Sequence, residues 1–236
     1  MRKAILMSGI FAVSMTAMSQ KNLTLHYDKP ATYFEETLVI GNGNIGASIY
    51  GGVDEERLSL NDITLWTGEP DTKVYSPDAY KTIPEIRKAL FAEDYHRADS
   101  LQKDIQGHYS ENYQPLGTLT FRSLTPTLAS GYSRQLDITK AVAQVAYNGF
   151  SREFFASAPD SVIVIRLKAT GNNRINTRFG YHCQLPHLTS AEKGELITDG
   201  YAAFTSLPGY TDIGDRFQYD SHRGIHFCTI VRIVNK

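Results

Sequence analysis

The chain has 236 residues, of which 42% are hydrophobic and 21% charged, and this composition excludes a disordered or collagen-like protein. Its length suits one large domain or two small ones. The formal net charge is −1 and no basic stripe runs along the sequence, so we expect no nucleic-acid partner.

The N-terminus has the pattern of a secretory signal peptide. Arg2 and Lys3 precede an apolar stretch at 4–15, and Ala17-Met18-Ser19 supplies the small residues that a signal peptidase accepts. The stretch is too short for a membrane span, and an apolar, disordered terminus is the alternative. We therefore expect residues 1–19 to be removed, leaving a periplasmic or secreted domain at 20–236 without a membrane span.

Most of the remaining chain alternates apolar and polar residues, as β-strands do. The segments are 45–50, 57–65, 117–121, 142–147, 161–168 and 225–233. Asn148-Gly149 predicts a type I′ hairpin turn. Apolar residues recur at helical spacing within 77–107, so we expect one or two helices there. The predicted fold class is all-β, a large antiparallel β-sandwich with a short α-helical insertion.

Gly41-x-Gly43-x-x-Gly46 has the spacing of a dinucleotide-binding loop, with Asp62 as a possible ribose ligand. Such a loop must lead into a helix whose N-terminus receives the pyrophosphate. Here an alternating stretch reaches Gly51-Gly52 after four residues, and two adjacent glycines would cost a helix about 2 kcal/mol relative to alanine. We expect no cofactor and interpret these glycines as turns between strands.

Other patterns of catalytic or metal-binding residues are weak. The pairs His182/His187 and His222/His226 are interpreted as structural or surface residues, so no metal site is predicted. Neighbouring residues of a strand point to opposite faces, so Glu35-Glu36 and Glu55-Glu56 are interpreted as charged turn residues and not as acid/base pairs. Cys183 and Cys228 could form a disulfide or be ordinary strand residues, and the sequence leaves both possibilities open.

The stretch from Leu25 to Pro70 resembles the N-terminal domain of glycoside hydrolase family 95, the α-L-fucosidases and their α-L-galactosidase relatives. Its motifs, and further ones up to residue 233, come in the order of that family. They include Ile40-Gly41-Asn42-Gly43, Gly51-Gly52-Val53, Glu56-Arg57-Leu58, Leu60-Asn61, Leu65-Trp66-Thr67-Gly68, Tyr113-Gln114-Pro115-Leu116-Gly117, Tyr132-x-Arg134-x-Leu136-Asp137, Arg152-Glu153-x-Phe155 and Gly224-Ile225-His226-Phe227. Two positions depart from the family pattern, Asn44 and Glu69.

The resemblance implies a multidomain, exported enzyme that removes terminal α-L-fucose from glycans with inversion. It implies that the β-sandwich supports a helical (α/α)₆ barrel that carries the catalytic residues, and we expect this barrel to lie outside the 236 residues. No catalytic residue is therefore assigned within the chain. The expected partners are a fucosylated oligosaccharide or polysaccharide and the C-terminal catalytic barrel.

Asn61, Asp62 and Trp66 are the candidate residues for a loop that faces the substrate cleft. The structural alternative is that Asn61 and Asp62 satisfy turn backbone while Trp66 fills the core. At the level of function, the alternatives are a free-standing carbohydrate-binding module without catalytic activity and a non-functional fragment with an exposed interface.

Overall fold

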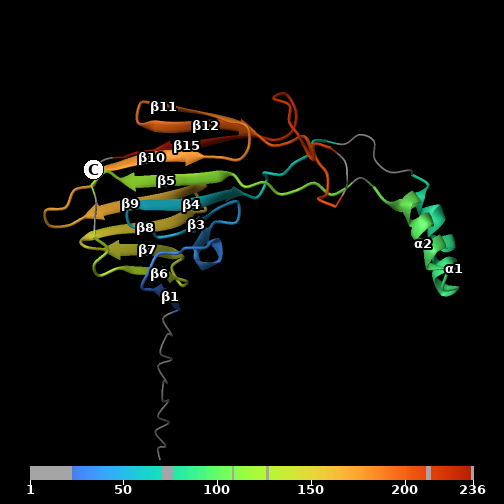
Figure 1. Ribbon diagram of the computed structural model, residues 1–236, viewed down its shortest axis with the longest axis horizontal. Coiled ribbons are helices and arrows are strands. Elements are labelled where there is room, and N and C mark those ends of the chain that lie inside the picture. The colour runs from blue at the N-terminus through green and yellow to red at the C-terminus, as the bar shows by residue number, and fades with distance from the viewer. Residues whose placement is uncertain (1–22, 71–76, 108, 126–127, 211–213, 235–236) are drawn as a thin grey trace, which may run out of the picture.

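The computed structural model describes residues 23–70, 77–107, 109–125, 128–210 and 214–234. Within them, two five-stranded antiparallel sheets pack against each other and a three-stranded sheet lies alongside (Figure 1). The predicted β-sandwich with a helical insertion is confirmed. The predicted signal peptide, 1–19, lies outside the described residues.

The strand order of each sheet departs from the order along the chain. The first sheet runs β1 (Thr24–Tyr27), β6 (Ser133–Asp137), β7 (Val142–Tyr147), β8 (Phe150–Ser157), β9 (Val162–Ala169). The second sheet runs β10 (Thr177–His182), β5 (Gly117–Ser123), β4 (Glu55–Asp62), β3 (Ile45–Ile49), β2 (Leu38–Gly41). The small sheet runs β11 (His187–Glu192), β12 (Glu195–Tyr201), β15 (His226–Arg232), and a ribbon pairs β13 (Thr205–Ser206) with β14 (Phe217–Gln218).

Local sequence signals set the turns as predicted. Asn148 and Gly149 have φ values of 40° and 77°, so both central positions of the β7–β8 turn adopt the positive φ of a type I′ turn. The predicted strand at 57–65 is shorter at its end, because β4 stops at Asp62. There the Asp62 carboxylate accepts hydrogen bonds from the backbone N–H of Thr64 at 2.8 Å and from its hydroxyl at 2.5 Å, which turns the chain.

The glycines of the G-x-G-x-x-G motif form a β-hairpin, as the sequence predicted. Gly41 at the end of β2 pairs with Gly46 in β3, and Gly43 has a φ of +95° in the turn between them. The Asn42 side chain holds the turn, because its oxygen accepts from the N–H of Ile45 at 3.0 Å and its nitrogen donates to the carbonyl of Ser157 at 2.8 Å. A strand follows where a phosphate-binding loop would need a helix.

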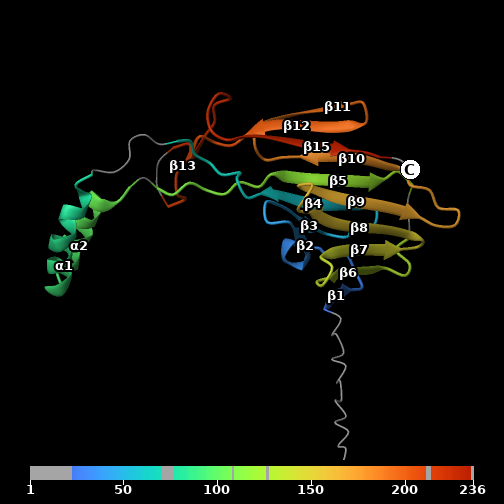
Figure 2. The same cartoon turned by 180° about the vertical axis from the view of Figure 1, so that it is seen from behind.

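The insertion consists of α1 (Ile83–Phe91) and α2 (Tyr95–Gln102), with short 3₁₀ turns at Ala79–Thr82 and Lys103–Ile105. Pro84 lies in the first turn of α1, and the Asp94 carboxylate caps α2 by accepting from the Arg97 N–H at 3.1 Å. Figures 1 and 2 show the two helices side by side and away from the sheets. No helix among the described residues is long and apolar enough to cross a membrane.

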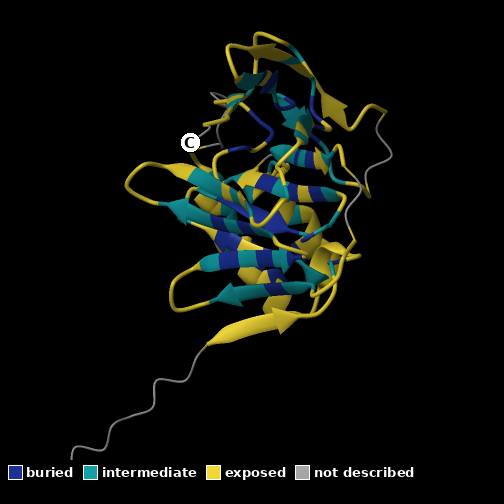
Figure 3. Cartoon of the chain, turned by 90° about the vertical axis from the view of Figure 1, so that its left-hand side faces the viewer, coloured by how far each residue is buried: buried dark blue, intermediate teal, exposed yellow. Residues whose placement is uncertain are grey.

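The core lies between the two large sheets. Its buried side chains come from alternate positions of the central strands, and Figure 3 shows them as dark bands, whereas β1 is exposed along its length. The core includes Leu38, Ile40, Ile49, Leu58, Leu60, Leu119, Phe121, Val145 and Phe154. Strand alternation therefore supplies one apolar face per sheet, and the two faces exclude water together.

A charged pair crosses this apolar core. Glu56 of β4 has no solvent exposure, and its carboxylate lies 3.0 Å from the guanidinium of Arg152 on β8, whose side chain is 8% exposed. The interpretation of Glu55-Glu56 as turn residues is therefore wrong. Both belong to a strand, in which Glu55 points outward to Arg122 at 3.0 Å while Glu56 points inward.

The buried pair also shapes the Gly51-Gly52 turn. Glu56 accepts a hydrogen bond from the Gly51 N–H at 2.6 Å, and Arg152 donates to the carbonyls of Gly52 and, at 2.9 Å, of Val53. A β-carbon on Gly52 would lie 1.9 Å from the Glu55 carbonyl oxygen, so only glycine fits. Burial raises the pKa of the Glu56 carboxyl, and Arg152 opposes that shift.

A second buried arginine holds the N-terminal segment on the first sheet. Arg134 of β6 donates to the carbonyl oxygens of Lys29 at 3.3 Å and Glu36 at 2.7 Å, and its guanidinium lies 4.4 Å from the ring centre of Tyr27. The two cysteines are free, with Cys183 buried and Cys228 exposed, so the disulfide left open by the sequence is absent between them.

We predict that replacing Arg152 destabilises the domain far more than replacing a surface arginine. Arg152→Leu leaves the Glu56 carboxylate buried without its cation, so the free energy of unfolding should fall by about 3–5 kcal/mol. Arg122→Leu breaks the exposed pair with Glu55 and should cost about 1 kcal/mol or less. Urea unfolding followed by circular dichroism measures both, and equal losses would contradict the role assigned to the buried pair.

Candidate functional site

Two aromatic residues lie together at one end of the sandwich. Trp66 and Tyr113 form an antiparallel bridge, in which the Thr67 N–H donates to the Asn112 carbonyl at 2.8 Å and the Gln114 N–H to the Leu65 carbonyl at 2.9 Å. Their rings are 5.9 Å apart and nearly perpendicular, and the two residues are 43% and 41% exposed. We call this pair the aromatic platform. The alternative in which Trp66 fills the core is wrong.

A hydrogen bond to the backbone fixes the orientation of the Trp66 indole. Its Nε1–H donates to the carbonyl oxygen of Ile63 at 3.0 Å, within the turn that Asp62 begins. A tryptophan with its polar edge satisfied and its ring in solvent is suited to stacking against a flat apolar ligand surface.

The other two predicted site residues have different positions relative to the platform. Asn61 is exposed, and its side-chain oxygen lies against Gly46. A β-carbon added to Gly46 would be 3.0 Å from this oxygen. Burial raises the pKa of the neighbouring Tyr113 hydroxyl, and its hydrogen bond with Asn61 opposes the shift. Asp62 turns the chain through Thr64, as the structural alternative predicted for it. Asn61 therefore adjoins the platform, whereas the Asp62 carboxylate is engaged in the turn.

A polar network lies behind the platform and fixes its two segments. The Glu111 carboxylate accepts from the hydroxyl of Thr67 at 2.5 Å and from the N–H and hydroxyl of Ser206 at 3.1 and 3.2 Å. Asn112 donates from its side chain to the Ser206 hydroxyl at 2.6 Å and from its backbone to the Thr67 hydroxyl at 2.8 Å. Thr67 and Asn112 each adjoin a platform residue in the sequence, so the network positions both rings.

The loop that follows Trp66 is also held in position by tertiary contacts. Gly68 has a φ of +108°, and a β-carbon there would meet Glu111 at 2.7 Å, so glycine is required by both conformation and space. Glu69, the departure from the family pattern, binds Arg223, whose guanidinium holds the pKa of this carboxyl below its ordinary value. Arg223 stacks on Phe204 at 3.6 Å from the ring centre.

The three carboxylates nearest the platform in sequence already have partners. Asp62 binds Thr64, Glu69 binds Arg223, and Glu111 binds Thr67 and Ser206. A glycosidase needs one carboxyl free to donate a proton and a second to activate water or attack the sugar. This arrangement holds the two segments of the aromatic platform in position.

The remaining sequence candidates are scattered. His182 lies on β10, whereas the ring of His187 on β11 hydrogen-bonds the Leu185 carbonyl at 2.8 Å. His226 packs against Tyr201, with ring centres 5.7 Å apart. Among the described residues no group of three or more His, Cys, Asp or Glu side chains is arranged to hold a metal ion.

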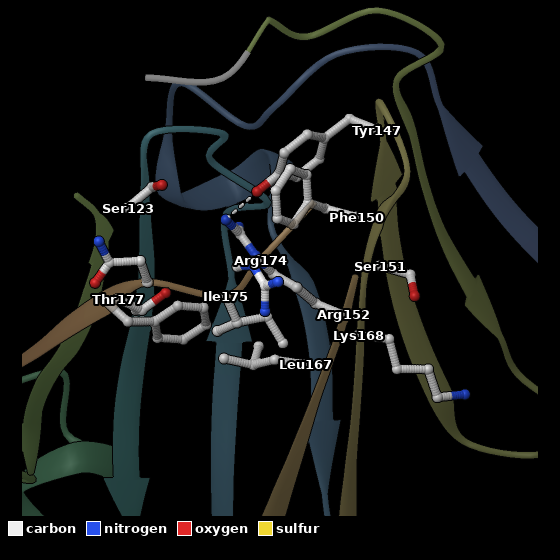
Figure 4. A pocket seen from close by; sticks show the side chains of 12 residues that line it. Ser123, Tyr147, Phe150, Ser151, Arg152, Leu167, Lys168, Arg174, Ile175 and Thr177 are labelled. Carbon is white, nitrogen blue, oxygen red and sulfur yellow. Dashed lines mark hydrogen bonds between the residues drawn. The ribbon is translucent and has the colours of Figure 1, made fainter. Parts of the chain in front are cut away.

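A small cavity opens at the far end of the sandwich, beyond the other end of β5. Figure 4 shows its lining, in which the Tyr147 hydroxyl meets the Arg152 guanidinium beside Phe150 and Leu167. The cavity holds about 30 Å³, enough for one or two waters and far below the several hundred Å³ of a typical ligand site. We therefore place the candidate site at the aromatic platform.

Sequence reasoning missed Tyr113 and Glu111. Tyr113 stood in a quoted motif, but no spacing rule pairs it with Trp66 across the helical insertion. Glu111 has no local signal at all, because its partners Thr67 and Ser206 come from distant parts of the chain.

Removing the Glu111 carboxylate should loosen the platform. Trp66 is the single tryptophan, so its fluorescence reports on this loop alone. We expect Glu111→Ala to move the emission to longer wavelength and to raise acrylamide quenching, with a loss of about 1–3 kcal/mol in the free energy of unfolding. Glu55→Ala, at a partly exposed site on β4, is the control. An unchanged emission spectrum in Glu111→Ala would show that the network does not hold Trp66.

Comparison with known proteins places the chain in a family. The family model described as glycosyl hydrolase family 65, N-terminal domain, matches residues 25–236. Alpha-L-fucosidase 2 of Arabidopsis thaliana is 31% identical over 225 residues, which are 89% of this chain and 26% of that protein. A probable alpha-fucosidase A of Aspergillus niger is 31% identical over 63% of this chain and 20% of its own length.

A second probable alpha-fucosidase A, from Aspergillus oryzae, is 24% identical over 96% of this chain and 31% of its own length. The chain thus spans between a fifth and a third of the length of these curated relatives. The resemblance deduced from the sequence motifs is confirmed, and the chain belongs to the family described as glycosyl hydrolase family 65, N-terminal domain, with similarity to part of the alpha-L-fucosidases.

Proposed function

We propose that this chain is the N-terminal domain of an exported glycoside hydrolase that removes terminal α-L-fucose from glycans with inversion. In this proposal the domain supports a C-terminal catalytic (α/α)₆ barrel and contributes one wall of the substrate cleft. The observation that carries the role of the domain is the exposed aromatic platform of Trp66 and Tyr113, held by a partly buried polar network and flanked by Asn61.

The platform is suited to contact with a sugar. The apolar face of a pyranose ring packs on an aromatic ring, while amide and phenol groups beside it exchange hydrogen bonds with the sugar hydroxyls. Asn61 and the Tyr113 hydroxyl provide such groups next to Trp66. Trp66 and Tyr113 lie outside the named strands, and the bridge between their two segments, together with the Glu111 network, holds the rings in a defined orientation.

The proposal assigns chemistry to the barrel because the carboxylates near the platform are engaged. Asp62, Glu69 and Glu111 all have hydrogen-bond or ion-pair partners. We place in that barrel the pair of carboxyls, about 6.5–9.5 Å apart, that inverting glycosidases use. Export is supported by the N-terminal sequence pattern at 1–19.

A free-standing carbohydrate-binding module is the second candidate. The same exposed pair, Trp66 and Tyr113, favours it, since an aromatic platform binds sugars without any catalytic group. Turnover separates the two candidates, because a binding module would retain glycan without hydrolysing it.

We expect no hydrolysis of a fucosyl-α-1,2-galactoside by residues 20–236 alone. Where the reading frame continues into the proposed barrel, the longer product should release β-L-fucose first, as inversion requires, and proton NMR of the nascent product detects this anomer. Turnover by the isolated chain would refute the assignment of the catalytic groups to the barrel.

Loss of the platform should weaken action on the glycan. Trp66→Ala in the longer product should lower kcat/KM about tenfold, which corresponds to about 1.4 kcal/mol of lost contact energy. Ile175→Ala removes an exposed apolar side chain at the opposite end of the sandwich and should leave kcat/KM unchanged. Equal kinetics for Trp66→Ala and wild type would contradict the placement of the platform in the substrate cleft. Glycan binding without turnover would favour the binding module.

A further inference from the structure

The small sheet has an outer face with a groove at one end. Pairing across β11, β12 and β15 places Leu188, Asp199 and Cys228 in one row on one face. Tyr201 and His226 form the next row of that same face, two residues along their strands. The residues of these two rows line a depression of about 710 Å³, which lies in the size range of sites for small ligands. We call it the outer groove.

Gly200 forms the floor of the outer groove. A β-carbon there would point to the inner face and stand 2.4 Å from the ring of Phe227, so the position between Asp199 and Tyr201 has to be glycine. The inner face is filled by packing, since Thr198 is buried and Phe227 contacts a small core of Leu65, Cys183, Leu185 and Ala202. The groove therefore has a rigid base and does not depend on a mobile loop.

The walls of the groove combine an aromatic surface with hydrogen-bonding groups. The rings of Tyr201 and His226 lie 5.7 Å apart with a 30° tilt, which makes one continuous aromatic wall. The exposed carboxylate of Asp199 lies in the adjacent row, where it accepts a hydrogen bond from the Cys228 thiol, and its remaining lone pairs are strong acceptors for hydroxyl groups. An aromatic surface beside a carboxylate acceptor suits a ligand that has an apolar face and many hydroxyls, which is the chemistry of a sugar.

Charge and the arrangement of apolar groups favour a neutral oligosaccharide over a protein partner. Asp199 provides the negative charge of the lining, so an anionic ligand would be repelled. Leu188 is the aliphatic side chain of the two rows that line the groove, whereas Ile197 and Ile230 form the next row outside the lining. The depression is therefore not a continuous aliphatic seat for a protein segment.

We propose that the outer groove of Tyr201, His226 and Asp199 binds a neutral oligosaccharide at a site separate from the aromatic platform. This inference rests on the proposed function, because it gives a glycan-acting protein a second contact with its glycan. It predicts that the platform and the groove lose binding independently when each is mutated.

The thiol of Cys228 offers a test in the unmodified chain. Cys228 is exposed within the groove, whereas Cys183 is buried, so alkylation by iodoacetamide at alkaline pH reports on the groove. A saturating oligosaccharide that ends in fucosyl-α-1,2-galactose should slow alkylation of Cys228 at least fivefold, as followed by mass spectrometry of the intact chain. An unchanged rate would overturn the proposal.

Substitutions of the groove residues test which side chains contact the oligosaccharide. Tyr201→Ala and Asp199→Ala should abolish the protection of Cys228, while Tyr201→Phe, which keeps the ring, and Trp66→Ala, at the platform, should retain it. Tyr80→Ala removes an exposed tyrosine far from the groove and is the matched control. Circular dichroism melting checks that each variant is folded. Protection that survives Tyr201→Ala, or is lost in Trp66→Ala, would overturn the assignment to the groove.

Two further outcomes also decide the proposal. Protection of Cys228 that grows with protein concentration in the absence of oligosaccharide would identify a protein as the occupant and overturn the glycan site. Hydrolysis of the fucoside by the longer product together with an unprotected Cys228 would refute the groove alone. Protection of Cys228 without any hydrolysis by that product would instead refute the proposed enzyme function.

Discussion

The ion pair between Glu56 and Arg152 is the interaction on which the rest of the sandwich depends. It joins a strand of one sheet to a strand of the other at one end of the apolar core, beside the Gly51-Gly52 turn. Both charges are desolvated, so the pair persists only because every donor and acceptor around it is used. Arg152 also binds the carbonyls of Gly52 and Val53, so the same contact sets the turn that leads into β4.

The turn at Gly52 and Val53 also positions the candidate site, because it leads into β4. β4 starts beside the buried pair with Glu55 and Glu56 and ends at Asn61 and Asp62, next to the aromatic platform. Leu58 and Leu60 are packed in the core between these two ends, so the strand acts as a rigid connection. A shift of one residue in the pairing of β4 would turn Glu56 to solvent and move Asn61 to the other face. The register that buries the charge is therefore the register that presents the site.

The platform and the outer groove share one support. A small second core contains Leu65, which precedes Trp66, and Ala202, which follows Tyr201. Leu185 of the same core lies just before Pro186 at the start of the groove. Both surfaces are thus exposed rims of one packed cluster, and this explains how two contacts for a single glycan could keep a constant separation.

The class of fold and the family can be predicted from the amino-acid sequence alone. Alternation of apolar residues, the Asn148-Gly149 turn and the Gly51-Gly52 interruption are local features, and each depends on the geometry of a few neighbouring residues. Linked motifs along the chain then identified the family without any knowledge of contacts. Trp66 and Asn61 could be named as site candidates for the same reason.

The contacts of those residues could not be predicted and are seen in the folded domain. Glu56 looks like one of a pair of surface charges until Arg152 is brought to it from another sheet, because an ion pair between distant strands leaves no periodic trace in the sequence. Tyr113 and Glu111 join the site because an antiparallel bridge closes the chain across the helical insertion. Long-range pairing of this kind depends on packing of the whole domain, and it assigned an exposed ring to Trp66 and a turn to Asp62.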